Sequence, residues 1–123
     1  MKKILIAEDE SILLDVLKNR FRADGWDVIT AINGDEAIEA VKKHPFDLVL
    51  LDLIMSQKDG FAVLREIREN PTFKTLPIIV LSNLGDQDNI KKALELGANN
   101  YYIKTQHSMS EMIEKANQYK SKN

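Results

Sequence analysis

Cysteine is absent from the 123 residues of the chain. Its absence excludes disulfides, thiol nucleophiles, iron–sulfur clusters and zinc sites built on thiolates. Only two histidines are present, so a metal site would have to hold a hard cation through oxygen ligands. The chain also lacks a strong charge of either sign, with a formal net charge of -2. We therefore expect no direct nucleic-acid partner.

Long apolar runs are missing as well. The first run covers residues 4–7 and stops at Glu8, whereas a secretory signal needs about 7–15 apolar residues and a membrane span about 20. We expect a cytoplasmic protein with no membrane partner. The chain is 44% hydrophobic and 29% charged, which is typical of a globular protein with a sizeable core. Its length suits one domain over residues 1–123.

Short apolar runs alternate with segments of helical period. Runs of this length without alternation are typical of strands buried on both faces, and they cover residues 4–7, 48–51, 78–81 and 101–103. Residues 26–31 are more polar and suit an edge strand. The helical segments are marked by Leu13, Leu17 and Phe21, by residues 35–43, by residues 61–67, by residues 90–94 and by residues 112–116.

The ends of the helical segments carry their usual signals. Gly25 and Gly97 are placed to end the first and fourth segments, and Ser108 or Ser110 to cap the last. Strict alternation of strand and helix predicts a parallel α/β sheet with helices on both faces. Five units favour a doubly wound, flavodoxin-like (βα)5 sheet of order 2-1-3-4-5. In such sheets the ligand lies beyond the carboxyl ends of the strands, near strands 1 and 3.

Polar side chains follow four of the five predicted strands. Glu8 and Asp9 follow the first strand, Asp52 the third, Ser82 the fourth and Lys104 the fifth. Each of these residues alone would suit a helix cap, a turn or a solvated surface. Together they predict one crevice that holds three carboxylates, a hydroxyl and an ammonium group.

Repulsion among the three carboxylates predicts a divalent cation or a proton in this crevice. An open site made of oxygen ligands is typical of Mg²⁺, which keeps several waters and contacts phosphate oxygens. A carboxylate beside Mg²⁺ can attack phosphorus and form an aspartyl phosphate. Ser82 and Lys104 would bind the remaining phosphoryl oxygens.

The chain resembles the receiver domain of response regulators in two-component signalling systems, the CheY-like family. The resemblance covers essentially the whole chain, and it is carried by these motifs in order: Glu8-Asp9 with Glu10, Asp52 with Met55 and Asp59-Gly60, Ser82, residues 94–98, and Tyr101 before Lys104. It implies a phosphorylation-dependent switch that modifies only itself and is no enzyme for other substrates. A histidine kinase or a phosphotransfer protein would donate the phosphoryl group. The output would pass to a downstream protein or a fused output domain.

The resemblance also implies a role for each site residue. Asp52 would be the phosphoacceptor, with Ser82 and Lys104 as catalytic partners. Asp9 and Asp52 would bind Mg²⁺ directly, Glu8 would act largely through a bound water, and Ile54 would contribute its backbone carbonyl. Ser82 and Tyr101 would form the switch pair, in which the hydroxyl moves to the phosphoryl group and the ring swings inward.

Four positions depart from the family pattern. Ser56 and Thr105 stand where the family usually has proline, and the second of those prolines follows a cis peptide bond. Because a cis bond before another residue costs about 2.5–4 kcal/mol, we predict that the Lys104–Thr105 bond is trans and that Lys104 is less firmly oriented. Asn99-Asn100 replaces an acidic pair found in dimerising members, which favours a monomer or a weak dimer.

Apolar side chains occupy two positions that we expect to flank the phosphoryl group, namely Ile54 and Leu84. Neither can orient an attacking water, so we predict slow hydrolysis of the acyl phosphate, on the order of hours. His107, in the loop after Lys104, is expected to be exposed rather than catalytic.

Three other functions fit parts of the pattern. A Mg²⁺-dependent phosphohydrolase of the haloacid dehalogenase type also forms an aspartyl phosphate, but it needs a second acid where this chain has Ile54. A flavodoxin-like cofactor carrier needs a glycine- and hydroxyl-rich loop after the first strand, where residues 8–10 would repel phosphate. A receiver-like scaffold that is never phosphorylated remains open, because two family prolines are absent.

Overall fold

The computed structural model describes residues 1–106 and 108–120, and the expectation for His107 lies outside these residues. Within them it has one parallel sheet of five strands in the order β2-β1-β3-β4-β5, which confirms the predicted topology. The strands are β1 (Lys3–Ala7), β2 (Asp27–Ala31), β3 (Leu48–Leu51), β4 (Ile78–Ser82) and β5 (Asn100–Ile103).

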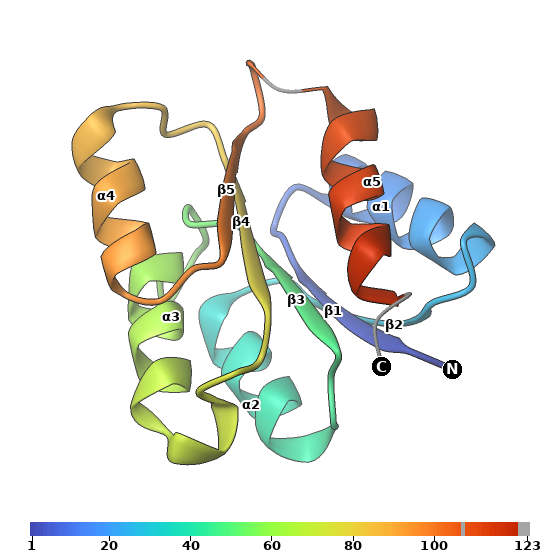
Figure 1. The fold of residues 1–123 in the computed structure, drawn as a ribbon, viewed down its shortest axis with the longest axis horizontal. Coiled ribbons are helices and arrows are strands. Elements are labelled where there is room, and N and C mark those ends of the chain that lie inside the picture. The colour runs from blue at the N-terminus through green and yellow to red at the C-terminus, as the bar shows by residue number, and fades with distance from the viewer. Residues whose placement is uncertain (107, 121–123) are drawn as a thin grey trace.

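The helices alternate with the strands, as the apolar pattern predicts. They are α1 (Ser11–Ala23), α2 (Gly34–Lys43), α3 (Gly60–Glu69), α4 (Gln87–Glu95) and α5 (Met109–Lys120), with a short 3-10 turn at Pro71–Phe73. Helices α1 and α5 cover one face of the sheet, and α2, α3 and α4 cover the other (Figure 1). None of the helices in the described part of the chain has the length and apolar character needed to cross a membrane.

The strands are apolar because both faces of the sheet are covered. All residues of β3 and β4 are buried, whereas the edge strand β2 exposes Asp27 and Thr30. One correction concerns α1, where Leu14 joins Leu17 and Phe21 in the core while Leu13 is half-buried at its margin. The four-residue spacing identified the helix and two of its buried residues, Leu17 and Phe21, and Leu14 completes the buried set.

Side-chain caps begin most of the helices. The carboxylates of Asp59 and Asp86 accept hydrogen bonds from the first turns of α3 and α4, and Asn33 does the same for α2. Of the two serines proposed for α5, Ser108 is the cap, because its hydroxyl accepts from the Glu111 amide at 3.1 Å. These caps position the loops that follow the carboxyl ends of the strands.

Arg68 of α3 holds the loop between α4 and β5. Its guanidinium donates to the carbonyl oxygens of Gly97 and Phe73 and to Oδ1 of Asn99. The same Asn99 oxygen accepts from the Ile78 amide at 2.8 Å, so this side chain ties β4 to the loop. Asn99, which replaces an acid of the dimerising members, therefore has a role within the fold.

We expect Gly97→Ala to destabilise the fold by about 1–3 kcal/mol, since Gly97 has φ +111° and an added Cβ would lie 2.7–3.0 Å from atoms of the Arg68 side chain. Gly85→Ala is the matched control, because its Cβ would meet no atom closer than 3.5 Å and its φ is not positive. Urea denaturation should show a loss for the first variant and a change within about 0.5 kcal/mol for the second. Equal stabilities would contradict the role of Gly97.

Candidate functional site

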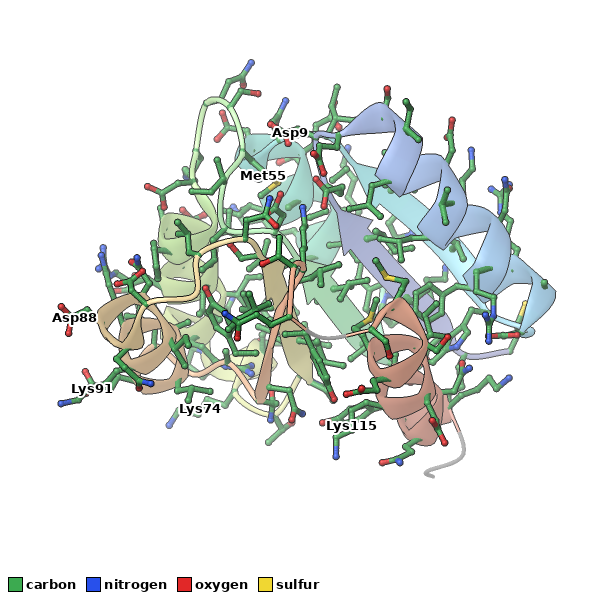
Figure 2. The ribbon with its side chains drawn as sticks, turned by 90° about the horizontal axis from the view of Figure 1, so that it is seen from above. Asp9, Met55, Lys74, Asp88, Lys91 and Lys115 are labelled. Carbon is green, nitrogen blue, oxygen red and sulfur yellow. The ribbon has the colours of Figure 1, made fainter. Side chains whose placement is uncertain are left out.

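The predicted crevice forms where β1 and β3 end. Strand β3 ends at Leu51, and the next amide, that of Asp52, still donates to the Ala7 carbonyl at 3.0 Å. The Glu8 amide likewise donates to the Ala31 carbonyl at 3.0 Å. These bonds extend the sheet by one residue at both strands, so Glu8 and Asp52 are buried while Asp9 faces solvent. Figure 2 shows Asp9 at the place where β1 leads into α1.

Three carboxylates meet in this crevice. Glu8, Asp9 and Asp52 each offer one oxygen, and these oxygens lie within 4.8 Å of one another. The donor set contains only oxygen, with one ligand open to solvent, which fits a hydrated Mg²⁺ better than a transition metal. The three acids that the sequence placed at strand ends are therefore together in space.

Lys104 crosses from the end of β5 into the acidic crevice. Its Nζ donates to Oε1 of Glu8 at 2.9 Å and to Oδ2 of Asp52 at 3.3 Å. A third carboxylate, that of Glu10, also lies 3.3 Å from Nζ. Burial alone would lower the Lys104 pKa, but its hydrogen bond to Glu8 and the charges of Asp52 and Glu8 outweigh burial, so the pKa is raised. Lys104 is therefore a fixed cation in the crevice.

Glu8 is the acid most affected by its surroundings. Burial raises its pKa from 4.5 to about 7, the Asp52 charge adds to this shift, and the hydrogen bond from Lys104 opposes it. A carboxyl that is 1% exposed and near a second carboxylate holds its proton to a higher pH than an exposed one, and a further cation would favour its ionised form. The crevice consequently favours either a proton or a divalent ion.

Ser82 and Tyr101 are linked through the turn that follows β4. The buried Ser82 hydroxyl accepts from the Leu84 amide at 3.1 Å, and the Tyr101 hydroxyl donates to the Leu84 carbonyl. The Tyr101 ring packs on the core face that α2, α3 and α4 cover, and burial raises the pKa of its phenol. The two residues expected to act as a pair thus share one backbone turn.

A hollow of about 170 Å³ opens above Asp52, with room for several waters. We call it the acidic hollow, and its lining residues are Asp9, Glu10, Asp52, Ile54, Asn83 and Lys104. Ile54 lies at this rim with 56% of its surface exposed, as expected. Leu84 does not line the hollow, because its side chain packs against the core, and Asn83 lines it instead.

The two positions where the resemblance implies proline, Ser56 and Thr105, both lie in loops near the site. The described residues contain no cis peptide bond, so the Lys104–Thr105 bond is trans as predicted. In the loop that contains Ser56, the next residue, Gln57, has φ +69°. The contacts of Lys104 with carboxylates supply an orientation that does not depend on a proline.

Glu10 is the site residue whose contact the sequence reasoning missed. It belongs to the quoted acidic motif, but the motif gives no reason for it to reach Lys104, 94 residues away. Its position as N-cap of α1 and the absence of a side-chain capping bond leave its carboxylate available to Lys104. The sequence itself signals only that a third acid directly follows the Glu8-Asp9 pair.

Comparison with known proteins agrees with this geometry. The family model described as response regulator receiver domain matches residues 4–117. Among curated relatives, a probable transcriptional regulator ycf27 of Galdieria sulphuraria is 41% identical over 103 residues, which are 84% of this chain and 39% of the relative. The ycf27 protein of Porphyridium aerugineum is 39% identical, over 84% of this chain and 42% of the relative. The chain thus spans about two fifths of these relatives.

Solved structures share the whole fold. The receiver domain of the Francisella response regulator 1452 has a TM-score of 0.88 at 29% identity, with 98% of each chain covered. A CheY of Borrelia burgdorferi, solved in complex with CheX, BeF3 and Mg, has a TM-score of 0.85 at 28% identity, covering 95% of this chain and 87% of that one. The matched family model, the fold and the strand-end residues lead to one conclusion: this chain belongs to the response regulator receiver domains.

Proposed function

We propose that the chain is a phosphorylation-dependent switch that accepts a phosphoryl group on Asp52 from a histidine kinase or a phosphotransfer protein. The observation that carries this proposal is the position of Asp52, buried below the acidic hollow with Lys104 Nζ 3.3 Å from its Oδ2. Glu8 and Asp9 stand beside it and could hold Mg²⁺. Bound Mg²⁺ would screen the acids and polarise the phosphoryl oxygens.

The residues of the site would act in the following way. An Asp52 carboxylate oxygen attacks phosphorus, the bond from phosphorus to the donor's imidazole nitrogen breaks, and its electron pair stays on the imidazole. Lys104 supplies a fixed positive charge for one phosphoryl oxygen, and the Ser82 hydroxyl binds another. Glu8 and Asp9 remain carboxylates throughout and orient the reacting groups.

The conformational response would begin at Ser82. When its hydroxyl turns to the phosphoryl group, the Leu84 amide loses the acceptor that it has at 3.1 Å in this structure. The turn can then shift together with the Leu84 carbonyl, which is the acceptor for the Tyr101 hydroxyl. This coupling would transmit the modification to the surface near α4 and β5, where a partner protein or a fused output domain could read it.

The donor protein needs a surface beside the acidic hollow. Helix α1 starts immediately after this site and exposes Ile12 and Val16, which are 81% and 53% exposed. These side chains are four residues apart and lie on one side of the helix. We propose that they contact an apolar surface of the donor while its phosphohistidine reaches Asp52.

Incubation with phosphoramidate and Mg²⁺ should add one phosphoryl group to the protein and none to Asp52→Asn. The reason is that the amide of asparagine is a poor nucleophile. Intact mass spectrometry detects the addition, and reduction of the acyl phosphate with borohydride maps it. Glu36→Gln on α2 is the control, because it also removes one negative charge but lies outside the acidic hollow, and it should still be modified. A protein that stays unmodified under these conditions would support the scaffold alternative.

Mg²⁺ should raise the melting temperature more at pH 8 than at pH 6. The folded protein holds a proton on Glu8 up to about pH 7, whereas the ordinary value of 4.5 applies to the unfolded chain, so stability without metal falls as pH rises from about 4.5 to about 7. Mg²⁺ binds the ionised carboxylates and restores stability above this window. Glu8→Gln should remove most of the pH dependence. Equal Mg²⁺ effects at both pH values would contradict the shared acid site.

Hydrolysis of the phosphorylated protein should be slow, with a half-life on the order of hours, because the Ile54 side chain at the rim cannot orient water. Loss of the added mass after removal of the donor measures this rate. Asn83→Ala should lengthen the half-life further, because the amide of Asn83 is the one side chain of these two at the rim that can bind water. A half-life of seconds in the parent protein, without a phosphatase, would refute the prediction.

A further inference from the structure

Glu10 has a contact that no role described so far explains. Its Oε2 lies 3.3 Å from Lys104 Nζ, and its side chain is 59% exposed. The other two carboxylates that contact Nζ belong to Glu8 and Asp52, whose side chains are only 2% and 6% exposed. Glu10 is therefore the solvent-facing member of three acids around one ammonium group.

The three carboxylates occupy all the N–H donors of Lys104 Nζ. A lysine ammonium has three N–H donors, and Glu8, Glu10 and Asp52 each accept at 2.9–3.3 Å. Glu8 and Asp52 also belong to the oxygen set that could hold a metal, whereas Glu10 does not. A cation held by Glu8 and Asp52 would compete with Lys104 for their oxygens, and the Glu10 carboxylate would still be able to accept from Nζ.

Glu10 is a useful partner for Lys104 because the other two acceptors, Glu8 and Asp52, belong to the oxygen set that could hold a metal. The Lys104 backbone amide donates to the Ser82 carbonyl at 2.8 Å, but the four-carbon stem has several rotatable bonds. The following Lys104–Thr105 peptide is trans, and Thr105 and Gln106 are exposed. The Glu10 carboxylate, which lines the acidic hollow together with Lys104, can restrict the ammonium group to the region beside Asp52.

We propose that Glu10 is a positioning residue that holds the Lys104 ammonium above Asp52 for the incoming phosphoryl group. This inference rests on the proposed phosphorylation of Asp52. Glu10 acts through Lys104 and does not touch the reacting atoms. An exposed ion pair is worth about 0.2–1 kcal/mol, so its loss should slow phosphorylation up to about fivefold.

Glu10 could also affect the rate by repelling the donor, and this effect has to be separated from the positioning of Lys104. The Glu10 charge would also repel an anionic donor, and its removal would then accelerate the reaction. That repulsion does not require Lys104, whereas positioning does. A double-mutant cycle distinguishes the two, because residues that act through each other show non-additive effects.

The experiment measures phosphorylation by phosphoramidate with Mg²⁺ in the parent protein, Glu10→Gln, Lys104→Met and the double variant. We expect Glu10→Gln to react about two- to fivefold more slowly and to have no effect in the Lys104→Met background. Asp15→Asn is the matched control, since it removes an acid from the exposed side of α1 that pairs with Lys18 rather than Lys104. A Glu10→Gln rate equal to or faster than the parent rate, or the same change in both backgrounds, would overturn the proposal.

A second readout does not depend on phosphorylation. The Lys104 ammonium should give a ¹⁵N-coupled NMR signal that its three hydrogen bonds protect from exchange, identified by its loss in Lys104→Met. Glu10→Gln should broaden or remove this signal, and Asp15→Asn should leave it unchanged. An unchanged signal in Glu10→Gln refutes the positioning role. A parent protein that shows the signal but is never phosphorylated refutes the proposed function instead.

Discussion

The gathering of like charges at one edge of the sheet is the constraint on which the rest of the structure depends. Parallel strands end at the same edge, so Glu8 and Asp52 are brought together by the pairing of β1 with β3. Burial raises the pKa of Glu8 by removing its carboxylate from water, and the charge of Asp52 raises it further. Lys104 offsets part of the repulsion, and a divalent cation is suited to offset the remainder.

The same charge repulsion makes the site suitable for the proposed reversible modification. A site whose charges were fully neutralised within the fold would have little reason to bind a cation. In this chain the two core faces of the sheet hold the strands firmly, while Asp9, Glu10 and Asn83 at the rim remain exposed. The rigid sheet fixes Asp52, the proposed acceptor, while the exposed loops have room to adjust to a bound group.

At two places where the chain departs from the family pattern, side-chain hydrogen bonds hold the local structure. Asn99 takes part in the Arg68 network and so fixes the loop between α4 and β5. Thr105 follows a trans bond, and the orientation of Lys104 comes from carboxylates around its ammonium group. In both places side-chain hydrogen bonds supply the local order.

The order of strands and helices, the faces of the sheet and the residues at the strand ends could all be predicted from the sequence. The reason is that apolar period, glycine and capping signals are local, and a parallel sheet brings its carboxyl ends to one edge. Local patterns do not specify how a side chain turns after its strand ends. Thus the buried position of Leu14, the packing of Leu84 away from the hollow and the reach of Glu10 to Lys104 were decided only by tertiary packing and by the balance of charges.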